Sequence, residues 1–238
     1  MTARDGTRSS RVETNEEISH PFVASVYDWV VPERFLFARH RRHLTQNLSG
    51  RVLDVGAGTG ANFPHVAAAE GAVEFHAIEP DRHMRRQAAE KAREVGCDVD
   101  LRDARAESLP YPDDAFDAVL ATLVFCTIHD PDAALAEVAR VLEPGGELRF
   151  LEHVRADGWR AAGQELLNPV WKRTAGGCHL DRDTVDRFVC NDAFAVEEIE
   201  RLSIGIFPAS PIVRGRLRRR RGDGEDAGDL FERVPSIP

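Results

Sequence analysis

A glycine-rich turn that begins beside an acidic residue is the stretch of this sequence best suited to hold a ligand. The apolar run Val52 to Val55 predicts a buried strand, and three glycines at alternate positions, from Gly56 to Gly60, end that strand. A helix can follow from Ala61 to about Ala69. Strand, glycine turn and helix in this order allow the backbone to approach a nucleotide-like ligand at a helix N-terminus.

The glycines alone leave two ligand classes open. The spacing Gly56-x-Gly58-x-x-Ala61 also fits the fingerprint of dinucleotide-binding turns. Asp54 favours the other class, because a carboxylate at the mouth of the turn would repel a pyrophosphate and attract the cationic α-amino group of a methionine moiety. The pattern Asp-x-Gly-x-Gly-x-Gly at residues 54–60 resembles the signature of class I S-adenosylmethionine (SAM) methyltransferases, and this resemblance implies SAM as the cofactor.

A second acidic residue, Glu79, lies 19 residues after Gly60, at the end of the next predicted strand, Ala72 to Ile78. A carboxylate at this interval can accept hydrogen bonds from both ribose hydroxyls, whereas the alternative is a solvated acid at a strand end. Pro80 follows it, and Asp81 is suited to cap the next helix.

The loop after the third predicted strand, Cys97 to Leu101, departs from the family pattern. In many SAM methyltransferases the matching loop reads Gly-Asp-Ala-Glu-x-Leu-Pro, and its aspartate contacts the adenine. Counting back from Leu109-Pro110, that position is Arg105 in this chain. Either Asp103 substitutes from two residues away, or only the backbone of Ala106 contacts the base.

The fourth predicted strand, Ala115 to Ala121, leads into the loop Thr122 to His129. Ligands of doubly wound sheets bind beyond the carboxyl ends of the strands, where the strand order reverses. We expect Thr122 near the methionine moiety and Cys126 or His129 near the acceptor, although most side chains of this loop can equally belong to the core. The residues predicted to bind SAM are Asp54, Gly56, Ala57, Gly58, Gly60, Asn62, Glu79, Pro80, Asp103, Ala106 and Thr122.

The fifth predicted strand, Glu147 to Leu151, places Glu152 and His153 at the rim of the same pocket. These two residues are the predicted catalytic pair. A thiol acceptor reacts as its thiolate, so a base assists the reaction, and His153 is the first candidate. A buried structural histidine is the alternative, and His129 and His179 are rival bases.

The N-terminal region contains two segments. Residues 1–20 are polar and charged and predict a disordered leader. Residues 21–48 are rich in aromatic residues and predict two short helices separated at Pro32. This arm can pack on the sheet edge, or it can form a lid in which Tyr27 and Phe35 line the substrate pocket, and the sequence leaves both roles open.

The C-terminal region has weaker patterns. Regular periodicity fails from Val154 to Leu180, and Asp181 can cap a helix that ends near Cys190. Ala195 to Ile206 and Ser210 to Leu217 predict two closing strands. The run Arg214 to Arg221 holds six arginines and precedes an acidic, glycine-rich segment, so residues 214–238 predict a charged flexible tail. A weak peripheral membrane contact through this tail is left open.

Composition excludes some function classes. The chain has 31 basic and 40 acidic residues and a net charge of −9, which argues against a nucleic-acid partner. Cys97, Cys126, Cys178 and Cys190 form no CxxC pair, which predicts reduced thiols, a cytoplasmic location and no metal site. No apolar run approaches the roughly 18 residues that span a bilayer, and the N-terminus lacks the apolar centre of a signal peptide.

Several segments resemble the small membrane-associated thiol S-methyltransferases of animals and their microbial relatives, in the methyltransferase type 11 branch. They include VGAGTGANF at 55–63, ATLVFCTI at 121–128, EVARVLEPGG at 137–146 and FLEHV at 150–154, and a fifth lies within 167–180. The resemblance implies an α/β Rossmann-like, doubly wound, seven-stranded sheet, mostly parallel with one antiparallel strand and with helices on both faces. The methyltransferase domain would span residues 21–213, with its SAM-binding core at 49–153 and its substrate side at 154–213. The family's N-terminal hydrophobic anchor has no counterpart here.

The resemblance implies methyl transfer from SAM to a small apolar acceptor, for example a thiol. Quinone C-methyltransferases and phospholipid N-methyltransferases share the glycine segment and the 137–146 segment, so both activities remain alternatives. A non-catalytic SAM-binding module and an NAD(P) reductase are more distant alternatives.

Overall fold

The computed structural model describes residues 36–202, 204 and 207–221. The predictions for the leader, Tyr27, Phe35 and the segment after Arg221 lie outside these residues. The helices are α3 (Ala38–Thr45), α4 (Phe63–Ala67), α5 (Arg82–Val95), α6 (Pro131–Val141), α7 (Gly158–Thr174) and α8 (Thr184–Val189). The strands are β1 (Gly50–Val55), β2 (Val73–Ile78), β3 (Asp100–Arg102), β4 (Phe116–Thr122), β5 (Leu142–His153), β6 (Phe194–Leu202) and β7 (Ile212–Arg219).

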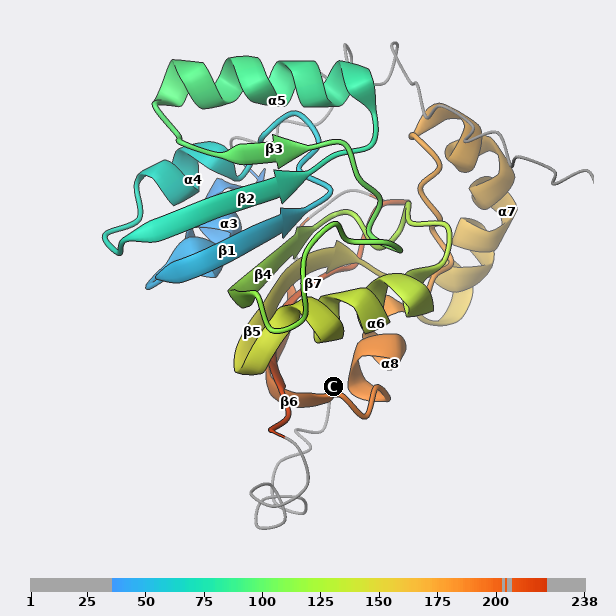
Figure 1. Cartoon of the computed structure of the whole chain (residues 1–238). Helices are drawn as coiled ribbons and strands as arrows, with labels where there is room; N and C mark the ends of the chain where they lie inside the picture. Colours follow the sequence, from blue (N-terminus) through green and yellow to red (C-terminus); the bar gives the residue numbers. More distant parts are fainter. Residues whose placement is uncertain (1–35, 203, 205–206, 222–238) are drawn as a thin grey trace, which may run out of the picture.

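The strands form one seven-stranded sheet in the order β3-β2-β1-β4-β5-β7-β6 (Figure 1). Strands β1 to β5 pair in parallel, and β7 runs antiparallel to both of its neighbours, β5 and β6. The predicted seven-stranded sheet with one antiparallel strand is therefore confirmed. The strand order reverses between β1 and β4, so ligands are expected beyond the carboxyl ends of these two strands.

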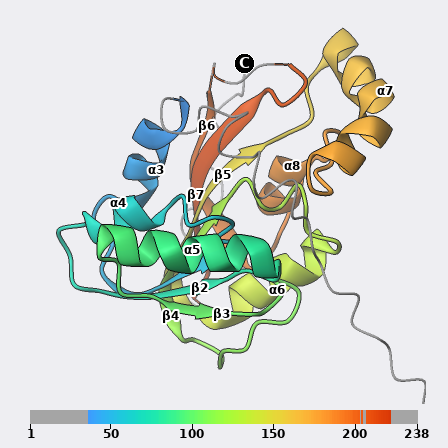
Figure 2. The same ribbon diagram turned by 90° about the horizontal axis from the view of Figure 1, so that it is seen from above.

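Helices cover both faces of the sheet. Helices α3, α4 and α5 lie on one face, and α6 and α8 lie on the other (Figure 2). Strand β1 supplies both cores, because Leu53 and Val55 pack into one cluster and Val52 into the other. Burial on both faces explains why the buried part of β1, from Val52 to Val55, is apolar except for Asp54.

Capping residues set the helix ends, and Asp81 caps its helix as the sequence predicts. The Asp81 side chain accepts hydrogen bonds from the backbone N–H groups of His83 and Met84 at the start of α5. Gly96 ends the same helix in the left-handed conformation, with φ of 66°. Asp130 caps α6 in the same way as Asp81 caps α5, and Pro131 occupies the first turn.

Helix α7 lies where we expected no regular structure. Its buried positions, Ala161, Gln164 and Asn168, follow helical spacing, but two of the three are polar, so the hydrophobic pattern is missing. Gln164 is fully buried; its side chain accepts from the Ala156 N–H and donates to the carbonyls of Pro208 and Ser210. Hydrogen bonds therefore attach part of this helix, which lies beyond the carboxyl ends of the strands (Figure 1).

The prediction that a flexible tail begins at Arg214 is wrong, because strand β7 continues to Arg219 between β5 and β6. Val213 and Leu217 pack into the core, which fixes the strand in the sheet. The arginines pair with carboxylates on neighbouring segments, with Glu200 and Glu197 on β6, Glu147 on β5 and Asp114. The carboxylates that pair with this run of arginines lie far from it in the sequence, so local charge patterns do not reveal them. In the described part of the chain no helix has the length and apolarity that crossing a membrane requires.

Candidate cofactor and acceptor site

Asp54, near the end of β1, carries a fully buried carboxylate, and one of its two oxygens accepts no hydrogen bond from the described residues. Its Oδ1 accepts a 2.9 Å hydrogen bond from Asn62 Nδ2. Its Oδ2 has no hydrogen-bond partner among the residues that the structure describes. Burial raises the pKa of Asp54 to about 7. A buried polar atom without a partner is costly, so this oxygen is suited to receive a donor from a ligand, ideally a cationic one.

The glycines of the turn have different functions. Gly56 has φ of 67°, and a Cβ there would lie 2.2 Å from Val124 Cγ2, so only glycine allows the two loops to touch. Gly58 has φ of 56°, but a Cβ there would meet nothing within 4 Å. The backbone at Gly58 thus borders open space that a ligand can fill.

Glu79, which follows β2, holds this turn. It is 6% exposed, and it accepts 2.8 Å hydrogen bonds from the backbone N–H groups of Gly58 and Asp81. Burial raises its pKa. Each carboxylate oxygen retains a further acceptor position, so Glu79 can fasten the turn and still accept hydrogen bonds from ligand hydroxyls.

Arg41 on α3 contacts two of the predicted cofactor residues, Asn62 and Thr122, although no sequence pattern distinguishes it from the other basic residues of that helix. Its Nη1 donates to Asn62 Oδ1 at 2.7 Å and to Thr122 Oγ1 at 2.8 Å. Asn62 Nδ2 also donates to Thr122 Oγ1, at 3.0 Å. The described part of the arm therefore packs in the core, through Leu44, and also contacts the predicted cofactor residues.

The predicted adenine residues occupy different environments. The Asp103 side chain is 67% exposed and forms a 2.7 Å ion pair with Arg85. Ala106 is buried. Their contacts with adenine remain predictions.

Glu152, predicted to be catalytic, supports the loop that follows β4. It is fully buried, and its Oε1 accepts hydrogen bonds from the backbone N–H groups of Val124 at 2.9 Å and Phe125 at 3.1 Å. Burial raises its pKa to about 7. Through these contacts Glu152 positions the loop that follows β4 and carries Cys126, and its catalytic role remains a prediction.

His153, the predicted base, is brought together with two cysteines. Its Nε2 lies 2.9 Å from Cys178 Sγ, and the ligand atoms of His153, Cys178 and Cys126 all lie within 4.8 Å of one another. The hydrogen bond from Cys126 and the facing imidazole lower the pKa of Cys178 to about 5. The same hydrogen bond and burial raise the pKa of Cys126.

The rival histidines lie outside this cluster. His129 is exposed after the β4 loop, and its backbone N–H donates to Glu107. The His179 side chain faces Asp181 across 3.9 Å, while its backbone N–H donates to the Cys126 carbonyl. Of the three candidate bases, His153 is the one that the structure places among buried reactive groups.

Residues 53–150 match the family model described as a methyltransferase domain. Human thiol S-methyltransferase TMT1A is 31% identical over 160 residues, which are 62% of this chain and 64% of that protein. Phosphatidylethanolamine N-methyltransferase of Cereibacter sphaeroides is 33% identical, over 53% of this chain and 62% of that protein. The quinone C-methyltransferase UbiE of Shewanella piezotolerans is 35% identical, over 55% of each. The chain thus matches less than two thirds of the length of these relatives.

Solved structures have the same fold. The [4+2]-cyclase SpnF superposes with a TM-score of 0.63 at 25% identity, covering 77% of this chain and 81% of that one. A SAM-dependent methyltransferase from Aquifex aeolicus superposes with a TM-score of 0.55 at 17% identity, covering 84% and 98%. The sheet order, the acidic glycine turn and these matches agree, and residues 53–150 are therefore similar in sequence and in fold to a methyltransferase domain.

Proposed function

We propose that this chain transfers a methyl group from SAM to a small apolar acceptor, with a thiol as the first candidate. The observation that carries the proposal is the unpartnered, buried Oδ2 of Asp54 beside the open backbone of Gly58. When bound, SAM supplies an electrophilic methyl group on a sulfonium centre. The protein has to hold the cofactor and the acceptor in line and exclude water.

Asp54 and Glu79 each suit one part of the cofactor. Asp54 would receive the α-amino group, because an ionised carboxylate and an ammonium form a charge-assisted hydrogen bond. Glu79 would accept the ribose hydroxyls while it holds Gly58. Asn62 and Thr122, joined by Arg41, would keep Asp54 and the β4 loop in register around the methionine moiety. Asp103 and Ala106 are the proposed adenine contacts.

The acceptor side is proposed at the loop after β4 and the end of β5. In the reaction the acceptor sulfur forms the new bond to carbon, the electron pair of the broken bond stays on S-adenosylhomocysteine (SAH), and the thiol proton is released. Thiols react as thiolates, so a group that promotes loss of this proton accelerates the step. His153 is the candidate residue, and the human relative named a thiol S-methyltransferase supports a thiol acceptor.

Two groups of alternatives have specific support. The relatives from Cereibacter sphaeroides and Shewanella piezotolerans carry the names of a phospholipid N-methyltransferase and a quinone C-methyltransferase. SpnF has this fold and is named a cyclase, so the fold is not restricted to methyl transfer. The second alternative is therefore a SAM-binding function without methyl transfer. The cytoplasmic location predicted from the cysteines belongs to the same proposal, and all four cysteines are free in the structure.

The test incubates the full chain with labelled SAM and separate panels of soluble thiols, quinones and extracted membrane lipids. Methylated thiol together with SAH is the expected result. His153→Ala should keep SAH affinity and lower turnover, with His129→Ala as the exposed control. Binding of SAM without SAH release from any acceptor class would contradict methyl transfer, and labelled lipid or quinone would replace the thiol acceptor.

A further inference from the structure

Three buried side chains from distant parts of the chain converge beside the proposed acceptor site. Cys126 follows β4, His153 ends β5, and Cys178 follows α7. Their side chains are buried, and their ligand atoms all lie within 4.8 Å of one another. Two thiols and an imidazole are the ligand set that Zn²⁺ prefers, and three protein ligands leave one coordination position open.

Hydrogen bonds hold the segments that carry these ligands. The His179 N–H donates to the Cys126 carbonyl at 2.9 Å, which ties the loop of Cys178 to the loop of Cys126. Arg182 donates to the carbonyls of Phe125 and Ile128, on both sides of Cys126. The Leu180 N–H donates to Asn168 on α7. The cluster is thus positioned by a network that extends across both loops, as supporting contacts position the ligands of metal sites.

The distance of 2.9 Å from His153 to Cys178 and the 4.8 Å upper limit on the other distances are compatible with a tetrahedral site. With Zn–S near 2.3 Å and Zn–N near 2.0–2.1 Å, ligand atoms of a tetrahedral zinc are separated by about 3.5–3.8 Å. The His153 and Cys178 atoms, 2.9 Å apart, would need to separate by less than about 1 Å, which side-chain rotation can provide.

We propose that Cys126, His153 and Cys178 bind a thiophilic divalent metal ion, with Zn²⁺ as the best fit. Binding converts the cysteines to metal-bound thiolates and releases their protons, and the imidazole ligates through a neutral nitrogen. The fourth position is open to water or to an exogenous thiol. Metal binding does not depend on the proposed function.

The role of the ion does rest on the proposed function. A thiol that occupies the open position loses its proton to solvent, because coordination to zinc strongly favours the thiolate. His153 would then act as a ligand and not as a free base. A disulfide between Cys126 and Cys178 is the competing use of the cluster, but it would leave the buried imidazole without a function.

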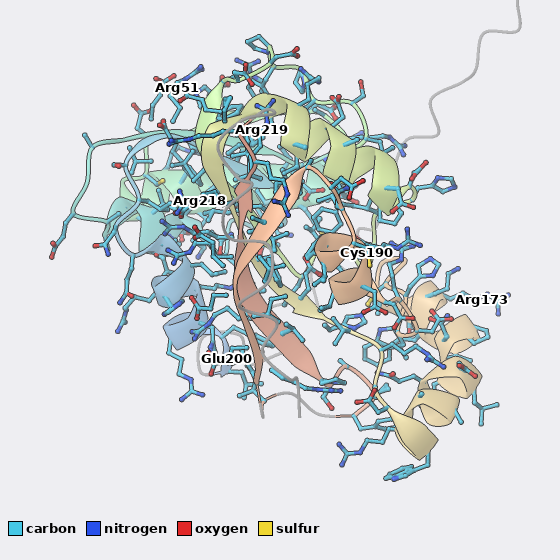
Figure 3. All side chains as sticks on the ribbon, turned by 90° about the horizontal axis from the view of Figure 1, so that it is seen from below. Arg51, Arg173, Cys190, Glu200, Arg218 and Arg219 are labelled. Carbon is cyan, nitrogen blue, oxygen red and sulfur yellow. The ribbon has the colours of Figure 1, made fainter. Side chains whose placement is uncertain are left out.

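The experiment uses the full chain, reduced and treated with a chelator, and titrates it first with Co²⁺ and then with Zn²⁺. We expect one equivalent of Co²⁺ with thiolate-to-cobalt charge-transfer absorption, and its loss when Zn²⁺ displaces the cobalt. Cys178→Ser should lower Zn²⁺ affinity by roughly 100-fold or more. Cys190→Ser is the matched control, because Cys190 is exposed at the end of α8, outside the cluster (Figure 3).

A readout on the unaltered chain covers the case in which a variant fails to fold. Zn²⁺ should protect Cys126 and Cys178 from alkylation and leave Cys190 reactive. The proposal would be overturned if the unaltered chain showed no charge-transfer band, or if a folded Cys126→Ser/Cys178→Ser variant still showed it. It would also be overturned if Cys126 and Cys178 formed a disulfide and the reduced chain bound no metal. Metal binding without methyl transfer would reject only the proposed function, whereas methyl transfer by a chain that binds no metal would reject only the metal site.

Discussion

Arg41 and Asn62 are joined by a 2.7 Å hydrogen bond from the guanidinium to the side-chain carbonyl, and the amide nitrogen of the same Asn62 holds Asp54. Helix α3 is therefore connected to the carboxylate proposed to receive the cofactor. Asn62 donates to both Asp54 and Thr122, so loss of the arginine would free an amide that positions these two residues.

Arg41→Ala is expected to weaken SAH binding about tenfold, because a charge-assisted hydrogen bond contributes roughly 1.5 kcal/mol or more. Calorimetric titration with SAH measures the effect. Arg42→Ala removes an exposed arginine from the same helix and should leave affinity unchanged. Equal affinities of the Arg41 and Arg42 variants would show that the contact does not support the cofactor site.

Gly58→Ala is expected to abolish measurable SAH binding while the chain stays folded. The added methyl group would point into the open space proposed for the cofactor, and φ of 56° adds a strain of about 1 kcal/mol. Gly96→Ala is a matched control, because Gly96 has φ of 66° and also has open space around it, at the far end of α5. Comparable SAH affinity of the two variants would place the cofactor elsewhere.

Asp54 should make cofactor binding depend on pH. Its pKa is about 7 in the free protein, and a cationic α-amino group favours the ionised form. SAH affinity should therefore rise by up to about tenfold per pH unit below pH 7 and level off above it. Asp54→Asn should bind SAH weakly and with a flat profile between pH 6 and 8, and an unchanged slope in this variant would assign the dependence to another group.

The same pKa has the opposite effect on the stability of the free protein. A carboxyl whose pKa is raised on folding contributes stability that is present below its ordinary pKa of 3.8 and is lost as the pH rises through about 7. The free energy of unfolding of Asp54→Asn minus that of the unaltered chain should therefore be more positive at pH 8 than at pH 5.5. Urea unfolding at both pH values measures this difference.

Glu152→Ala is expected to destabilise the chain by about 2 kcal/mol, because it leaves the N–H groups of Val124 and Phe125 without their acceptor. Glu152→Gln keeps an acceptor oxygen and should lose less. Glu143→Ala, an exposed glutamate at the start of β5, is the control in urea unfolding. A loss of turnover in Glu152→Gln with unchanged stability would return Glu152 to a catalytic role.

Local patterns predicted the elements that carry the proposed cofactor residues. The strand, the glycine turn and the cap at Asp81 depend on residues a few positions apart, so their geometry follows from backbone preferences. Asp54 and Glu79 could be placed together because parallel strands bring their carboxyl ends to one edge of the sheet.

Local sequence patterns did not predict the features whose interaction partners are distant in sequence. In the sequence, the arginines of β7 are typical of a solvated tail. In the structure, they form ion pairs with Glu147, Glu197 and Glu200. Helix α7 has polar buried residues, so periodicity could not identify it.

The sequence by itself indicated the fold class and the class of cofactor, because the acidic glycine turn and the segments around it resemble those of class I SAM methyltransferases. Only the tertiary structure decided that Arg41 reaches Asn62 and that Cys126, His153 and Cys178 meet. Cys126 and His153 are 27 positions apart, His153 and Cys178 are 25 positions apart, and no sequence motif links the three residues. Contact between these residues results from the packing of loops at one end of the sheet, where side chains from separate elements share a single buried space.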